Sequence, residues 1–356
     1  MTTRRAFLAS LLATGAAPGL GWAAAGNPAY LAAARDASGG FALHGLNAGG
    51  QSLFAIPLPA RGHAGAGHPI RAEAVAFARR PGSFALVIDC VTGQVRHRLS
   101  PPEGRQFNGH GCYARKGARL YTAEQESETS AGRIGVWDAG KGYRRIGDFP
   151  SGGIGPHEIR LMPDGQTLAV ANGGIATDPT DRRKLNIGTM RPNLSYLDIA
   201  GPILEQIELN PDLRKNSIRH LALRADGLLA FAMQWEGAEG AAPPLLGLHR
   251  RGTDPVLPEA PLAAEFAMQG YAGSVAFSGD GAQVAITSPR GGRLHCFSPD
   301  GGFLGAFSRA DVCGLAPRAD GFLLSDGLGG LLALAGLTPR ALAQHHLAWD
   351  NHIVSL

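Results

Sequence analysis

The sequence predicts an all-β protein, a seven-bladed β-propeller in which N- and C-terminal strands together close the last blade. Glycine and proline are abundant, with 51 and 24 of 356 residues, and only 17% of residues are charged. That profile is typical of many short strands joined by tight turns. Short apolar runs and Asp-Gly-type turns also recur at intervals close to the ~40–50 residues of a four-stranded blade. Two stacked sandwiches would not explain this repeated turn.

The elements follow in order from the turns. Six turns, each expected to follow the innermost strand of its blade, lie near residues 82, 117, 165, 227, 281 and 321. Apolar runs after them predict strands over 84–89, 120–123, 167–171, 228–232 and 283–287, and more polar third strands are expected over 133–138 and 293–297. Residues 27–60 and 351–356 are left to form the seventh blade.

One polar insertion, Gly173–Tyr196, exceeds the length of a blade loop. Long loops on a rigid scaffold often carry function, although a plain surface loop explains this composition equally well.

The N-terminal segment reads as an export signal. Thr2–Leu8 contains paired arginines followed by Ala-Phe-Leu and an apolar stretch, and Ala23–Ala25 offers small residues for cleavage. We therefore expect a twin-arginine signal peptide over residues 1–25, a single propeller domain over 26–356, and a periplasmic location. No other stretch has the ~18 apolar residues of a membrane span.

The net charge bears on the class of partner, and the cysteine spacing bears on disulfide formation. The formal charge is +4, and two of the arginines belong to the expected leader. The sequence has no basic stripe, so we expect no nucleic-acid partner. We also expect the protein to be a monomer. The cysteines form no C-x-x-C pair, so disulfides and buried free thiols both remain open for Cys90, Cys112, Cys296 and Cys313.

A short phrase made of a histidine, alternating apolar residues and a turn recurs along the chain. Because the start of each inner strand faces the channel mouth of a propeller, its histidines should meet there. The phrase predicts a metal site formed by His110, His157, His220 and His352. Imidazole suits copper and iron, the two metals we expect. A lone histidine on such a strand is more often structural. His157 is one residue out of register and needs a bulge to join the others.

Other side chains are assigned supporting or surface roles. Glu158, Glu124, Arg219 and Cys313 are expected to supply charge or contacts around the metal ligands. His63 and His68 fall in a Gly-rich segment that reads as a loop. These two are assigned to the surface together with His44, His97, His249, His295, His345 and His346.

The chain resembles a known family. Ile154–Gly165, the Asn-Gly-Gly-Ile segment 172–175, the Thr-Met-Arg-Pro-Asn-Leu segment 189–194 and Ser217–Ala222 are similar to exported propellers called domain of unknown function 1513. The resemblance implies genes beside imelysin-type and di-haem peroxidase-like proteins in iron-linked clusters, hence periplasmic iron-handling partners. More distantly, the histidine phrases resemble those of lactonase-type propellers and of nitrous oxide reductase.

Three functions are compatible with these observations. The favoured one is a periplasmic protein that binds iron or copper at the channel mouth and assists iron uptake or handling. The second is an enzyme at the same site, either redox or lactonase-like; its sign would be an open coordination position beside Glu158 or Arg219. The third is an interaction scaffold that docks a partner on the insertion. No Gly-x-Ser-x-Gly motif or P-loop is found.

Overall fold

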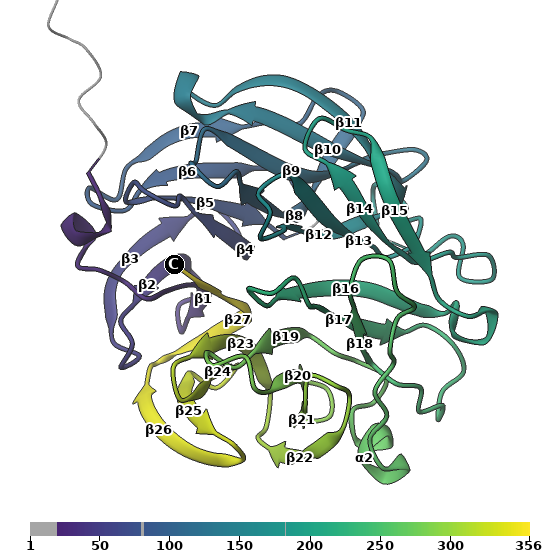
Figure 1. Cartoon of the computed structure of the whole chain (residues 1–356). Helices are drawn as coiled ribbons and strands as arrows, with labels where there is room; N and C mark the ends of the chain where they lie inside the picture. Colours follow the sequence, from purple (N-terminus) through teal and green to yellow (C-terminus); the bar gives the residue numbers. More distant parts are fainter. Residues whose placement is uncertain (1–19, 80–81, 182) are drawn as a thin grey trace, which may run out of the picture.

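The computed structural model describes residues 20–79, 82–181 and 183–356. Seven antiparallel sheets are arranged around a central axis, as Figure 1 shows. One sheet has the order β27-β1-β2-β3, so the last strand of the chain pairs with the first. The predicted seven-bladed propeller, closed by N- and C-terminal strands, is therefore confirmed. The expected signal peptide falls largely on residues 1–19, outside the described residues.

The strands occupy four positions from the axis outward. The innermost are β4 (Gly62–Gly67), β8 (Arg105–Tyr113), β12 (Pro156–Leu161), β16 (Asn216–Leu223), β19 (Ser274–Phe277), β23 (Val312–Arg318) and β27 (Leu347–Ser355). The second are β5 (Glu73–Ala78), β9 (Arg119–Glu126), β13 (Thr167–Asn172), β17 (Leu229–Trp235), β20 (Val284–Ser288), β24 (Gly321–Asp326) and β1 (Tyr30–Asp36).

The outer strands complete the blades. The third are β6 (Ala85–Asp89), β10 (Ala131–Asp138), β14 (Asn193–Asp198), β18 (Leu246–His249), β21 (Arg293–Phe297), β25 (Gly330–Ala335) and β2 (Phe41–Leu46). The fourth are β7 (Val95–Leu99), β11 (Arg144–Ile154), β15 (Ile203–Glu208), β22 (Phe303–Ser308), β26 (Thr338–Gln344) and β3 (Ser52–Leu58); the blade of β16 has three strands.

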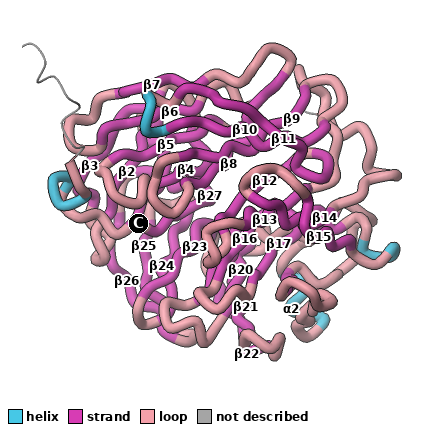
Figure 2. The backbone as a smooth tube through the Cα atoms, turned by 45° about the horizontal axis from the view of Figure 1, so that its top comes forward, coloured by secondary structure: helices cyan, strands magenta, loops and turns pink. Residues whose placement is uncertain are grey.

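Helical segments are short and peripheral. In the part of the chain that the structure describes, they are α2 (Leu262–Ala267) and three 3-10 turns over Trp22–Ala25, Ala139–Lys141 and Pro211–Leu213. Figure 2 shows them at the edges of a body made of strands and loops. Among the described residues, no helix has the length and apolar character needed to cross a membrane.

The hydrophobic core lies between blades. In one interface Tyr121 and Ile134 pack with Leu168 and Val170 of the next blade, and each of these side chains is fully buried. Alternation along each strand supplies an apolar row to both neighbouring blades. The innermost strands therefore line the central axis, and polar residues of these strands face one another there.

One element of the expected layout was wrong. The turn near residue 82 was taken to follow an inner strand, but it joins β5 to β6, the second and third strands of its blade. The true inner strand is β4, whose sequence Gly-His-Ala-Gly-Ala-Gly was interpreted as a loop because glycine is rare in strands. This shift places His63 on an inner strand.

All four cysteines are free thiols. Cys90, Cys296 and Cys313 are buried, and Cys112 is partly buried. Of the two interpretations left open by the sequence, the structure therefore has thiols packed in the blades.

A buried histidine away from the axis provides a test of the core. His295 is fully buried against Phe297 and Phe303, neither ring nitrogen has a hydrogen-bond partner, and burial lowers its pKa to about 4. Since the unfolded chain binds this proton near pH 6.5, the histidine costs stability increasingly as pH falls from about 6.5 toward 4. We expect His295→Leu to raise the free energy of unfolding by ~1–2 kcal/mol at pH 7.5 and by ~1–2 kcal/mol more at pH 5.

Denaturant unfolding at the two pH values measures both parts of this effect. His295→Gln is the matched variant, because it keeps a buried polar group but cannot titrate, and it should show only the gain at pH 5. An equal gain for His295→Leu at both pH values would contradict the assignment of a neutral, unpartnered imidazole.

Candidate metal centre

Five histidines from five inner strands meet on the propeller axis. His63 lies on β4, His110 on β8, His157 on β12, His220 on β16 and His352 on β27. We call these five residues the histidine cluster. Each is at most 9% exposed. The four histidines selected from the sequence are thus brought together, and His63 joins them.

Irregularities in the inner strands aim these side chains at the axis. In β12, Pro156 pairs with Asn172 and Ile159 with Val170, so one extra residue sits at His157 and forms the predicted bulge. The register also shifts around His63, His110, His220 and His352. In contrast, β19, which carries Ser274 at this level, pairs without a shift. Bulges re-aim side chains and commonly adjoin functional sites.

Gly109 shows how closely these strands approach. Its φ is +92°, and a Cβ there would lie 2.6 Å from Cδ2 of His63. Any other residue would therefore strain the backbone and displace the neighbouring imidazole. Asn108 donates from Nδ2 to the carbonyl of Pro156 at 2.7 Å, which fixes β8 against β12.

The imidazoles form a closed group. Ring centroids are 4.7 Å apart for His110 and His157, 4.7 Å for His157 and His220, and 4.6 Å for His220 and His352. His63 lies 4.7 Å from His352 and 4.9 Å from His110. Ligand nitrogens lie within 4.8 Å of one another in two triads, His63–His110–His352 and His110–His157–His220. His110 belongs to both triads.

The protonation state suits coordination. Burial lowers the pKa of His110 and His157 well below the ordinary value and that of His352 to about 3, so all three are neutral at pH 7. Nε2 of His110, Nδ1 of His157 and Nε2 of His352 are buried and have no hydrogen-bond partner. Buried polar atoms are normally satisfied, and a metal ion would satisfy several of these at once. The donor set therefore fits a transition metal.

Glu158 is a buried carboxylate that contacts the histidine cluster at His220. It is 5% exposed, and its Oε2 accepts from the amide of Leu221 at 3.0 Å and lies 3.4 Å from Nδ1 of His220. Its Oε1 lies 2.6 Å from Arg160. Burial alone would raise the pKa of this carboxyl, but Arg160 and His220 hold it below its usual range. A charged carboxylate is thus held against one imidazole, as is common around metal-binding histidines.

Of the other three supporting residues named from the sequence, Arg219 lines a cavity next to the histidine cluster, whereas Glu124 and Cys313 do not. Arg219 is buried beside His220 and lines the cavity described below. Glu124 is fully buried inside its blade, where Arg145 forms two hydrogen bonds to it at 2.7 and 2.9 Å. Cys313 contacts Ser325 and the carbonyl of Asp350. Neither Glu124 nor Cys313 lines a cavity at the cluster, so we leave both out of the proposed site.

His63 was missed although the sequence contained a signal for it. Forty-seven residues separate His63 from His110, and the same number separates His110 from His157. That interval is the length of one blade. The glycines around His63 concealed the strand, whereas the spacing would have revealed it.

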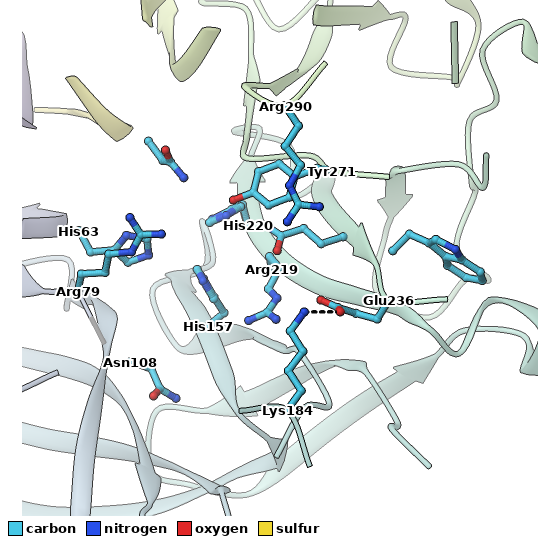
Figure 3. Close-up of a pocket in the computed structure, with 13 residues that line it drawn as sticks. His63, Arg79, Asn108, His157, Lys184, Arg219, His220, Glu236, Tyr271 and Arg290 are labelled. Carbon is cyan, nitrogen blue, oxygen red and sulfur yellow. Dashed lines mark hydrogen bonds and ion pairs between the residues drawn. The ribbon is translucent and has the colours of Figure 1, made fainter. Parts of the chain in front are cut away.

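The histidine cluster separates two spaces on the axis. On one side is a cavity of about 240 Å³, which we call the upper cavity, and His63, His157 and His220 form part of its wall. On the other side a space of about 30 Å³ is lined by His110, His220 and His352 together with Glu158. Figure 3 shows the histidines of the upper cavity with Arg79, Arg219, Arg290 and Lys184 around the same space. The cluster is therefore accessible to a ligand from the upper cavity.

The fold and the cluster together define a seven-bladed propeller with an axial histidine site. Residues 56–356 match the family described as protein of unknown function (DUF1513), and the chain belongs to that family. No curated protein matches. Among solved structures the chain is similar to Kuenenia stuttgartiensis hydrazine synthase, with 13% identity, 86% of this chain and 89% of that chain covered, and a TM-score of 0.60. At that identity the likeness is one of fold.

Proposed function

We propose that this protein binds a transition metal, iron or copper, through the histidine cluster, and that it serves as a periplasmic accessory protein in iron uptake or handling. The convergence of five buried imidazoles from five blades is the observation that carries the proposal, and ring nitrogens of His110, His157 and His352 have no hydrogen-bond partner there. His110, His157 and His352 are neutral at pH 7 and need release no proton on binding. An all-nitrogen donor set favours copper over the other divalent metals, while the iron-linked gene context of similar proteins favours iron.

The rest of the proposal comes from the sequence. Export by the twin-arginine route is inferred from Thr2–Leu8 and would deliver a folded, metal-loaded protein. Imelysin-like and peroxidase-like periplasmic proteins are the partners implied by family resemblance. Fractionation of cells expressing the full chain, with and without Arg4→Lys and Arg5→Lys together, tests the route: the double variant should remain in the cytoplasm.

Metal analysis tests the central claim. Protein purified from the periplasm is analysed for metals, then stripped and reconstituted with Fe²⁺, Cu⁺, Cu²⁺ and Zn²⁺. We expect tight binding of iron or copper, and for Cu²⁺ nitrogen hyperfine splitting in the electron paramagnetic resonance spectrum. His44→Ala removes a buried histidine outside the cluster and should bind as the wild type does. Wild-type protein that is isolated metal-free and refuses all four ions would refute the proposal.

An enzyme at the same site is the second candidate, and the upper cavity is the observation that favours it. A substrate there would reach the cluster beside Arg219. Turnover of peroxide with a reductant, or of lactones, by the metal-loaded protein would support this function. Metal-loaded protein without either activity, and with spectra unchanged by azide, would argue for binding alone.

A further inference from the structure

The upper cavity has an unusual charge for a space beside a metal site. Among the described residues, its lining contains four cationic side chains, Arg79, Lys184, Arg219 and Arg290, and one acidic side chain, Glu236. Lys184, from the insertion Gly173–Tyr196, forms an ion pair with Glu236. Lys184 and Arg290 lie at the exposed rim, whereas Arg219 is 6% exposed, next to His220. Positive charge is therefore concentrated from the rim to the histidines.

The cations approach from different sides. Arg79 follows β5, Arg219 lies on β16 and Arg290 follows β20, so three blades contribute one guanidinium each. Arg290 is stacked on the ring of Tyr271, 4.5 Å from its centre, which orients it at the rim. Figure 3 shows these groups around one common space. Guanidinium forks match carboxylate oxygens in pairs, and groups on several sides favour a ligand with more than one carboxylate.

A metal ion bound by the histidine cluster would add positive charge beside the upper cavity. Imidazole ligands bring no negative charge to the ion, and Glu158, which lines the smaller space, is already paired with Arg160. An anion in the upper cavity would be attracted both by the ion and by the guanidinium groups that line the same space.

We propose that the upper cavity binds a small di- or tricarboxylate, held by Arg219, Arg79 and Arg290 with one carboxylate directed at the histidine cluster. The cavity of about 240 Å³ has roughly the volume of eight water molecules at ~30 Å³ each, enough for a compact ligand of this class. The inference deepens the proposed function, because metal and carboxylate would share one site. The insertion then has a role in ligand binding, since Lys184 closes the rim.

Calorimetric titration with tricarballylate tests the inference. This tricarboxylate lacks the hydroxyl group of citrate and chelates metal ions weakly, so it can be titrated into metal-free and metal-loaded protein alike. We expect one molecule per chain in both forms and tighter binding to the metal-loaded form. Arg219→Gln and Arg290→Gln should each weaken binding about tenfold or more. Arg340→Gln, which removes an exposed arginine on the outer strand β26, should leave the affinity unchanged.

The outcomes separate this inference from the metal proposal. Tricarballylate that binds the metal-free wild type and depends on Arg219 and Arg290 supports the inference even if no metal binds. Metal that binds while tricarballylate gives no heat overturns the inference and leaves the metal proposal intact. Phosphate that binds more tightly than tricarballylate overturns the assignment of a polycarboxylate. Because Arg219 is buried, Arg290→Gln at the rim keeps the test valid if Arg219→Gln fails to fold.

Discussion

His110→Ala is expected to weaken metal binding by about 100-fold or more, the largest effect of any single substitution in the cluster. The reason is geometric. His110 belongs to both groups of three imidazoles whose nitrogens lie within 4.8 Å of one another, so its loss leaves neither triad complete. His157→Ala leaves His63, His110 and His352 together, and His352→Ala leaves His110, His157 and His220. Each of those variants should lose only about tenfold.

Competition with a chelator of known affinity measures this series, and circular dichroism checks that each variant is folded. His44→Ala is the matched control, since it removes a buried imidazole from β2. The ranking is diagnostic: a structural cluster would lose stability in all variants with no order in metal affinity. If His110→Ala binds as tightly as His157→Ala, the two triads do not share a ligand and the site must be redrawn.

The fold was predictable because the repeated turn reports on local backbone chemistry. Asp164-Gly165 and Asp226-Gly227 sit in turns, with Gly165 and Gly227 at φ values of +71° and +87°. Such positions can be read from sequence without knowledge of distant contacts. Closure of the ring by Tyr30–Asp36 and Leu347–Ser355 also followed from counting blades.

The site was only partly predictable, because its composition depends on which strand lies innermost. For His110, His157 and His220 the turn that follows identified the inner strand, and His352 was placed by its fit to the register of His220. For His63 the turn belongs to another pair of strands, and the glycines of β4 reduced the strand signal. Glu124 is the opposite case, a residue that the sequence assigned to the site and that lies outside it. Its carboxylate pairs with Arg145 on the outermost strand β11 of its own blade, and no local sequence pattern reveals that pairing. The positive upper cavity arises from residues of several blades and was not foreseen.

Glu158→Gln is expected to weaken metal binding by about 10–100-fold and to lower the free energy of unfolding by ~2–4 kcal/mol. Both carboxylate oxygens are engaged, one by Arg160 and the other by the amide of Leu221 and Nδ1 of His220. A glutamine side chain has only one acceptor oxygen, and an NH₂ group replaces the other oxygen. The NH₂ group must therefore lie against hydrogen-bond donors, either Arg160 or the Leu221 amide. His220 then loses the negative partner that orients its ring, and Arg160 or the Leu221 amide loses an acceptor.

Glu124→Gln separates the two effects. Glu124 is also fully buried and bound to an arginine, at 2.7 Å from Arg145, but its partners lie within its own blade. We expect Glu124→Gln to lose comparable stability and to keep wild-type metal affinity. Chelator competition and denaturant unfolding on both variants give the comparison. If both lose metal affinity in proportion to stability, Glu158 acts on the metal only through the fold; if only Glu158→Gln loses it, the carboxylate positions His220 for binding.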